Sequence, residues 1–282
     1  MSTIRVNNVE LYYERHGAGE PLVFISGLGG HLGEVPYLTD SYRRHVDFIA
    51  YDSRGCGRSE KPAGAFTVAG FADDAAALIE ALGLESAVVY GSSMGGMVAQ
   101  ELALRHPRRV RALILGCTTA GAVNGVPPAA DTVQQMVRNQ PLTGDEAIVA
   151  GWRLGYSEAY IAANYDAMLA RSREASRHSA PPDSYMRQIV AAAKHDAWDR
   201  LHEIGCPVMI LHGSNDVMIP PANAQLMKAG IAHAELQILK GMGHGYNLEA
   251  QQEADALVLD FVRRHGAMHA ASSGEGTAHA VR

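Results

Sequence analysis

The segment Gly91–Gly95 could carry out nucleophilic catalysis, because Gly-Ser-Ser-Met-Gly has the Gly-x-Ser-x-Gly pattern of a nucleophile elbow. In such an elbow a strand turns sharply into a helix and presents one hydroxyl group at the turn. The apolar run Ala87–Tyr90 precedes the pattern as a strand would, and helically spaced apolar residues follow it until Pro107. The pattern therefore predicts Ser93 as a nucleophile at the bend.

A serine hydroxyl is a weak nucleophile until a base, commonly a histidine held by a carboxylate, removes its proton. In elbow-type hydrolases the acid and then the histidine follow the serine along the chain. Asp216 comes just after the apolar run Val208–Leu211, and His244 lies between glycines after the run Leu236–Leu239. Because the carboxyl ends of parallel strands meet at one edge of a sheet, these positions favour Asp216 as the acid and His244 as the base.

Other residues compete for these two roles. Asp199, Glu203 and Glu249 are alternative acids, but none of them follows a predicted strand. The chain has 13 histidines, and His212 is interpreted as a structural residue at a strand end. Cys117 follows a predicted strand and is a candidate lining residue of the site.

Acyl transfer also needs two backbone N–H groups that point at the developing oxyanion. The N–H of Met94 lies at the predicted start of the helix after Ser93, where helix geometry directs it suitably. The glycine-rich loop Ser26–Gly30 follows another apolar run, and we expect the second donor to be the N–H of Leu28.

The elements that must position these residues alternate between strands and helices. Predicted strands are Leu22–Ser26, Phe48–Tyr51, Ala87–Tyr90, Ala112–Gly116, Val208–Leu211 and Leu236–Leu239, with a leading hairpin of Ile4–Val6 and Glu10–Arg15. Helical patterns cover Phe71–Leu82, Met94–Arg105, Ala222–Ala229 and Leu248–Arg264. The fold class is therefore α/β: a mainly parallel eight-stranded sheet with helices on both faces.

The alternation stops between residues 118 and 201, where the pattern is helical only. Helices are expected near Asp131–Asn139, Asp145–Leu154, Glu158–Ser172 and Ser184–Ala193. Thr143 with Glu146 has the pattern of a capping box at the start of the second of them. We interpret 118–201 as a helical lid inserted between two core parts, 1–117 and 202–266, and we expect the tail 267–282 to be disordered.

A lid over this sheet must face the Ser93 pocket somewhere, and its aromatic residues are the candidates for an apolar substrate site. Trp152, Tyr156 and Tyr160 are the pocket residues that we predict. Arg153, Arg171 and Arg173 are candidates for binding a substrate carboxylate, but the pattern singles out none of them.

Composition limits the partners. The net charge is −6, and no basic cluster indicates nucleic-acid binding. No apolar stretch approaches the roughly 20 residues that a membrane helix needs, and the first residues lack a signal-peptide pattern. The three cysteines lack metal-ligand spacing and suit a reducing compartment. We therefore expect a cytoplasmic protein that acts on a small molecule, needs no cofactor or metal and binds no membrane. The sequence leaves open whether it forms a homo-oligomer.

These motifs resemble the α/β-hydrolase fold superfamily over residues 3–266. The resemblance depends on Gly91–Gly96, on Tyr51–Ser59, on His212–Asp216 and on Gly243-His244. It implies a structural role for Arg54. Many members have His-Gly where this chain has Ser26-Gly27, and a non-histidine residue there resembles 3-oxoadipate enol-lactonases and some methyl esterases. The serine at the elbow differs from the aspartate of haloalkane dehalogenases and epoxide hydrolases.

Together, these features predict a serine hydrolase that cleaves a small or medium carboxylic ester or lactone through an acyl-enzyme on Ser93. Hydrolysis of a carbon–carbon bond in a diketone-type substrate is an alternative for the same triad. Relatives with that activity tend to carry an aromatic residue after the base, where this chain has Gly245. A non-catalytic receptor for a small ligand is the alternative from another class.

Overall fold

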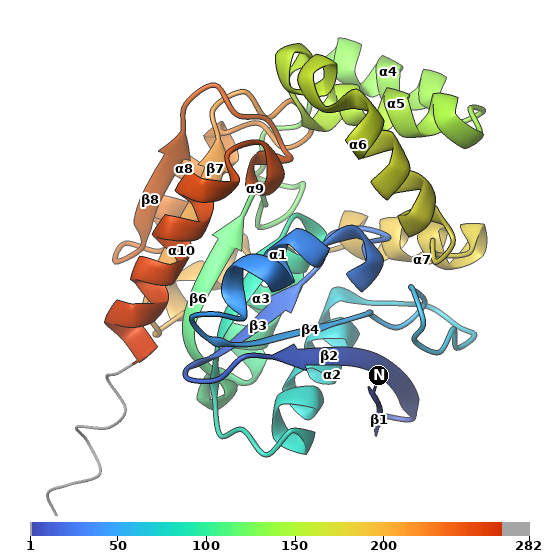
Figure 1. Cartoon of the computed structure of the whole chain (residues 1–282). Helices are drawn as coiled ribbons and strands as arrows, with labels where there is room; N and C mark the ends of the chain where they lie inside the picture. The colour runs from blue at the N-terminus through green and yellow to red at the C-terminus, as the bar shows by residue number, and fades with distance from the viewer. Residues whose placement is uncertain (1, 267–282) are drawn as a thin grey trace, which may run out of the picture.

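A single sheet of eight strands organises the computed structural model, which describes residues 2–266 (Figure 1). The strands lie in the order β1-β2-β4-β3-β5-β6-β7-β8. Their bounds are β1 Ser2–Val6, β2 Val9–His16, β3 Pro21–Ile25, β4 Asp47–Tyr51, β5 Ala87–Ser92, β6 Val110–Gly116, β7 Val208–Gly213 and β8 Glu235–Leu239. Strand β2 pairs antiparallel with β1 and β4, and all later pairs are parallel. The predicted fold class is confirmed.

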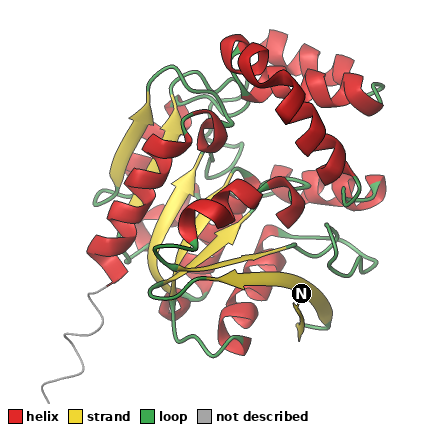
Figure 2. Cartoon of the chain, in the orientation of Figure 1, coloured by secondary structure: helices red, strands yellow, loops and turns green. Residues whose placement is uncertain are grey.

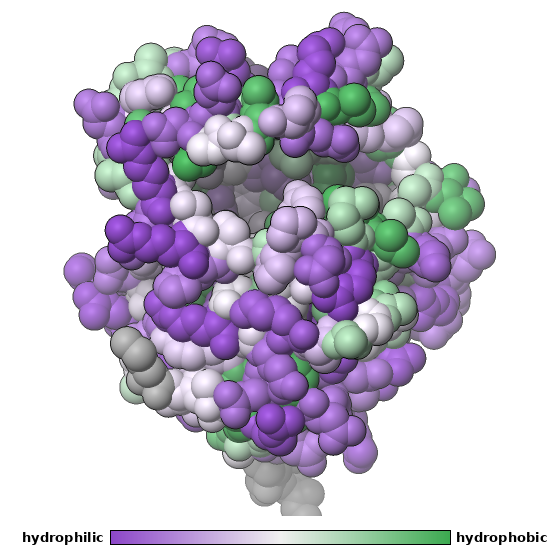
Figure 3. All heavy atoms as spheres, turned by 90° about the vertical axis from the view of Figure 1, so that its right-hand side faces the viewer, coloured by the Kyte–Doolittle hydropathy of each residue, from purple (hydrophilic) through white to green (hydrophobic). Residues whose placement is uncertain are grey.

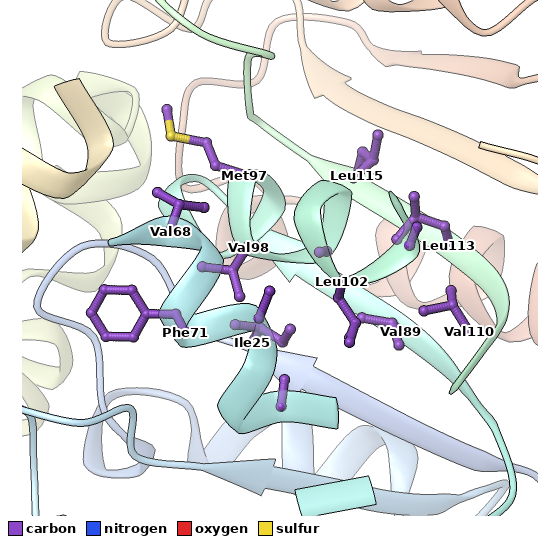
Figure 4. Close-up of a cluster of buried hydrophobic side chains, with 14 of the residues drawn as sticks. Ile25, Val68, Phe71, Val89, Met97, Val98, Leu102, Val110, Leu113 and Leu115 are labelled. Carbon is purple, nitrogen blue, oxygen red and sulfur yellow. The ribbon is translucent and has the colours of Figure 1, made fainter. Parts of the chain in front are cut away.

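The central strands are buried on both faces, so their sequences are nearly continuous apolar runs. In β3 every residue is buried, and successive side chains point to opposite faces. Val23 and Ile25 join a hydrophobic cluster with α2 (Val68–Ala81), α3 (Met94–Arg105) and α8 (Ala222–Gly230). Figure 4 shows part of this cluster, in which the α2 and α3 side chains meet those of β3, β5 and β6.

The opposite face is covered by α1 (Pro36–Tyr42) and α10 (Gln251–Gly266). Leu22 and Phe24 of β3 pack there with Leu38 of α1 and Phe261 of α10. The sheet is therefore a middle layer between two helical layers (Figure 2).

Four helices lie above that edge, between β6 and β7 (Figure 1). They are α4 Ala130–Asn139, α5 Gly144–Gly155, α6 Glu158–Ser176 and α7 Pro182–Ala193. Ser157 caps α6 by accepting a hydrogen bond from the N–H of Tyr160, and Pro182 occupies the first turn of α7. An isolated bridge between Gly121 and Asp196 joins the two chain segments that lead to and from these helices. The lid boundaries at 118 and 201 stay a prediction.

Three local expectations need correction. The predicted helix Leu248–Arg264 is interrupted at Ala250, between α9 (Tyr246–Glu249) and α10, because Ala250 has non-helical dihedral angles. The predicted capping box at Thr143 is wrong, because the Thr143 side chain makes no capping hydrogen bond. The next residue, Gly144, has a φ of 57°, whereas the first helical residue after a capping box has a negative φ. Helix α1 was not predicted at all. The predicted disorder of 267–282 lies outside the described residues.

Three short 3₁₀ helices complete the described elements: η1 Leu32–Glu34, η2 Pro107–Arg109 and η3 Trp198–Glu203. Within residues 2–266, no helix combines the length and the hydropathy that crossing a bilayer requires.

Candidate active site

Ser93 occupies the sharp turn between β5 and α3. Its φ of 57° and ψ of −122° are rare for a residue with a side chain and must be held by the surroundings. The Ser93 N–H donates to the Gly116 carbonyl at 2.9 Å, and the Ser93 carbonyl accepts from Thr118 Oγ1 at 2.7 Å. The neighbouring strand β6 and the residues after it therefore fix the backbone of the elbow.

The glycines beside Ser93 allow α3 to start directly against the sheet. A Cβ added at Gly95 would lie 2.6 Å from the carbonyl oxygen of Ser26, and one at Gly91 would lie 2.8 Å from the Cβ of Ala99. Such distances are too short for real carbon atoms, so the backbones could not approach as they do. Gly91 and Gly95 therefore have a packing role: they allow α3 to lie close to the sheet.

Asp216 and His244 form a hydrogen-bonded pair. His244 Nδ1 lies 2.7 Å from Asp216 Oδ2, and the Asp216 Oδ1 accepts from the backbone N–H groups of Met218 and Ile219, both at 2.9 Å. The carboxylate is almost fully buried in the turn after β7, whereas His244 follows β8. This arrangement leaves the Nε2 of His244 free to act on a proton.

His212 also contacts the acid, which sequence reasoning did not foresee. Its Nε2 lies 2.8 Å from the carbonyl oxygen of Ile219 and 3.2 Å from Asp216 Oδ2. Burial alone would raise the pKa of Asp216, but hydrogen bonds from His212 and His244 outweigh it and lower the pKa to about 2. Asp216 is therefore an anion across the physiological range, as a carboxylate that orients a base must be.

Ser93 and His244 line the same cavity, of about 290 Å³. Gly27 lies beside the nucleophile, since a Cβ built on it would be 3.6 Å from the Oγ of Ser93. Leu28 lines the cavity as well, and Asp216 lies behind His244. The structure thus brings the three side chains proposed from sequence to one edge of the sheet.

The loop Ser26–Gly30 leads from β3 past Ser93, and its turn is closed by the Gly30 N–H donating to the Gly27 carbonyl at 3.0 Å. Among the described residues, no acceptor binds the N–H of Leu28 or of Met94. The next N–H, of Gly29, donates to Gln188 Oε1 of α7 at 2.8 Å. Two N–H groups near Ser93 are therefore available to an oxyanion, and a residue of α7 holds the loop that carries one of them.

A second cavity of about 330 Å³, called the lid cavity below, is lined mainly by residues of α5 and α6. Figure 3 shows the molecular surface hollowed on this side. Trp152 and Tyr156, both predicted as pocket residues, line this lid cavity, and Tyr156 also lines the Ser93 cavity. Tyr160 lines neither: it stacks on Tyr156 with ring centroids 5.7 Å apart. Its placement in the pocket is corrected: Tyr160 lies in the first turn of α6, and its ring packs on Tyr156 instead of lining either cavity.

Sequence reasoning missed several lining residues. Those of the Ser93 cavity include Phe24, Glu34, Val35, Tyr37, Tyr185, Met218 and Asn247. Glu34 and Tyr37 belong to η1 and α1, two short elements whose apolar spacing is too brief to be recognised. The only available signal was their position directly after the glycine-rich loop.

Two further expectations concern Cys117 and Arg54, which have no proposed catalytic role. Cys117 does not line either cavity; its buried thiol lies 3.4 Å from Ser92 Oγ, and burial raises its pKa to about 12. Arg54 pairs with the buried carboxylate of Asp74 at 2.6 Å, which agrees with its structural role. Within residues 2–266, no group of three or more His, Cys, Asp or Glu side chains is arranged to hold a metal ion.

A larger hollow of about 930 Å³ lies away from Ser93, among α2, α3 and η2. Its charged residues largely neutralise one another, as in the pairs Arg105–Asp73 and Arg109–Glu80. None of the residues proposed for catalysis lines it.

Comparison with known proteins agrees with this fold. The family model described as the alpha/beta hydrolase fold matches residues 20–251. The RutD protein of Azorhizobium caulinodans, named as a candidate carbamate hydrolase, is 29% identical and covers 90% of this chain and 95% of its own. The 3-oxoadipate enol-lactonase 2 of Acinetobacter baylyi is 28% identical, over 93% of this chain and 96% of its own.

Among solved structures, Est816, described as an N-acyl homoserine lactone degrading enzyme, is similar with a TM-score of 0.79 and 29% identity. The match covers 93% of this chain and 100% of Est816. Sheet order, elbow and family match all agree, and the chain is a hydrolase that belongs to the alpha/beta hydrolase fold family.

Proposed function

We propose that the protein is a serine hydrolase that cleaves a small or medium carboxylic ester or lactone through an acyl-enzyme on Ser93. The observation that carries this proposal is the 2.7 Å hydrogen bond between Asp216 and His244, made beside the cavity that His244 shares with Ser93. A buried carboxylate that holds a histidine next to an elbow serine is the arrangement that activates a hydroxyl group for acyl transfer.

In the proposed reaction His244 Nε2 takes the proton of Ser93 Oγ as the oxygen attacks the substrate carbonyl carbon. The N–H groups of Leu28 and Met94 stabilise the oxyanion, and Asp216 stabilises the imidazolium that forms. His244 then returns the proton to the leaving oxygen, which releases the alcohol or opens the lactone. Water, deprotonated by His244, attacks the acyl-enzyme and releases the acid while Ser93 recovers its proton.

Ester or lactone hydrolysis is favoured over carbon–carbon cleavage by the surroundings of Gly245. The Tyr156 ring fills the space where a side chain at Gly245 would project, so the aromatic residue expected after the base of a carbon–carbon hydrolase has no room. The enol-lactonase and lactone-degrading names of two relatives support the same choice.

We further propose a cytoplasmic enzyme with a small-molecule substrate and no nucleic-acid or membrane partner. All three cysteines, Cys56, Cys117 and Cys206, are free thiols, which suits a reducing compartment.

The experiment that tests the function is pre-steady-state hydrolysis of p-nitrophenyl acetate and butanoate. We expect a burst of p-nitrophenol equal to the enzyme concentration, its absence in Ser93→Ala, and a loss of turnover on the order of 10³-fold or more in that variant. His244→Ala should lose activity to a similar degree. Full turnover in either variant would exclude the assigned nucleophile or base.

A further inference from the structure

Glu34 is an acidic residue at the junction of the two cavities. It ends η1, just beyond the glycine-rich loop, and lines both the Ser93 cavity and the lid cavity. Its side chain keeps 48% of its surface accessible, and the residue borders these two hollows. A substrate that occupied both cavities would therefore lie beside Glu34.

No cationic side chain neutralises Glu34. Among the described residues its one ion-pair partner is His31, whose Nε2 lies 3.6 Å from Glu34 Oε1. Burial lowers the pKa of His31, so this ring is uncharged near neutral pH. Arg171 lines the lid cavity but stacks over Tyr37, 5.7 Å from its ring centroid, and forms no ion pair with Glu34.

The other groups around Glu34 do not supply a positive charge either. Tyr37 and Tyr156 line both cavities, Tyr185 lines the Ser93 cavity, and the pKa of each phenol is raised by burial. Desolvation by the surrounding walls and the carboxylate of Asp52 raise the pKa of Glu34 to about 7, although about half of the side chain stays accessible. A cation bound beside Glu34 stabilises the charged carboxylate, because it supplies the opposite charge that no neighbouring side chain provides.

We propose that Glu34 is a specificity residue that selects esters or lactones carrying a protonated amine, with the ammonium group held at the junction of the two cavities. The proposal rests on the function assigned to the Ser93 cavity and names its substrate class. An ammonium N–H can donate a charge-assisted hydrogen bond to Glu34 while the scissile carbonyl lies at Ser93. Arg171 repels the same ammonium from the lid cavity and so confines it to the junction.

The test measures binding in the Ser93→Ala protein, which cannot turn substrate over. Two pairs of esters, matched in shape, differ only in a tertiary amine and its carbon analogue. In the first pair, 2-(dimethylamino)ethyl butanoate and 3-methylbutyl butanoate, the group is on the alcohol side. In the second, methyl 4-(dimethylamino)butanoate and methyl 5-methylhexanoate, it is on the acyl side. By calorimetry at pH 8 we expect the amine to bind at least about tenfold more tightly in one of the two pairs, a difference of about 1.4 kcal/mol.

Variants attribute the preference to Glu34. Adding Glu34→Gln should bring the affinity ratio close to one, whereas adding Arg171→Met should raise it, because the repulsion is gone. The matched control is Glu158→Gln, which removes an exposed carboxylate from the first turn of α6 that borders neither cavity. The control should keep the full ratio.

The preference should also weaken as the pH falls from 8 to 5.5, since Glu34 then takes up a proton. His244 lines the same cavity, so the comparison is repeated with His244→Ala added, and the pH effect should persist there. Equal binding within both pairs, or a ratio that survives Glu34→Gln, would overturn the proposal. Tighter binding of the carbon analogue in both pairs would overturn it as well. Because binding is measured without turnover, these outcomes are independent of the burst experiment that tests the Ser93 mechanism.

Discussion

The ring of Tyr156 packs directly against Gly245, the residue that follows His244: a Cβ added at Gly245 would lie 2.6 Å from Cζ of Tyr156. The Gly245 N–H also donates to the carbonyl oxygen of Gly155 at 2.8 Å. The end of α5 is therefore joined to the turn that carries the proposed base. A side chain that lines both cavities is at the same time a packing partner of the catalytic loop.

Truncation of Tyr156 should change the acyl-chain preference. Tyr156 lines both the Ser93 cavity and the lid cavity, so removing its ring in Tyr156→Ala should give longer acyl chains more space. We expect the ratio of kcat/KM for p-nitrophenyl decanoate to that for the butanoate to rise about tenfold, in line with the about 1–3 kcal/mol that apolar pocket changes contribute.

Tyr156→Phe is the matched control for this experiment, because it keeps the ring and removes only the hydroxyl group. Its chain-length profile should stay that of the wild type. An unchanged profile in Tyr156→Ala would show that the ring does not limit the space for the acyl chain.

Asp216 should make stability depend on pH in the acid range. Its pKa is lowered to about 2 in the folded protein, so the unfolded chain takes up the proton first as the pH falls. The resulting stabilisation is complete above about pH 4, near the unfolded pKa, and is lost as the pH approaches 2; it amounts to about 2 kcal/mol.

Urea unfolding of wild type and Asp216→Asn at several pH values between 5 and 2 measures this contribution. The difference in unfolding free energy between the two proteins should shrink by about 2 kcal/mol over that range. Asp131→Asn, a change at an exposed position of α4, should track the wild type. A constant difference between wild type and Asp216→Asn would contradict the lowered pKa.

Gln188 should act as a positioning residue for the oxyanion loop. Its Oε1 accepts from the Gly29 N–H at 2.8 Å, one residue beyond Leu28, and its Nε2 lies 2.8 Å from Cys56 Sγ. Because oxyanion donors act on the transition state, Gln188→Leu should lower kcat about tenfold, less than the roughly 10²-fold or more of losing a donor outright, with little change in KM.

Gln188→Glu keeps an acceptor for Gly29 and should recover most of the kcat lost in Gln188→Leu. Thermal unfolding of both variants separates this effect from loss of the fold. A rise in KM at constant kcat would instead place Gln188 in ground-state binding.

The catalytic candidates could be predicted because each depends on a local pattern. Ser93 is marked by glycines that the tight elbow requires. Asp216 follows the fully buried strand β7, and His244 follows β8, a partly exposed strand at the edge of the sheet. The sheet could be predicted for the same reason, since strands buried on both faces are apolar throughout.

The residues that line the two cavities were harder to predict from the sequence than the catalytic candidates. Which side of a lid helix faces the core depends on how separate elements pack, so Tyr156 and Tyr160 look alike in sequence although only Tyr156 reaches the cavities. Glu34 lies in elements too short to show periodicity. His212 was recognised as structural, but its approach to Asp216 depends on the path of the chain through Ile219.

The hydrogen bond between Gly29 and Gln188 limits how the helical segment above the sheet can be exchanged between related enzymes. A chimaera that receives its lid from a relative inherits a new pocket but also a new neighbour for the loop beside Ser93. Only donor lids that present an acceptor to the Gly29 N–H should preserve the rate of the host, so the lid and the chemistry beneath it are not freely interchangeable modules.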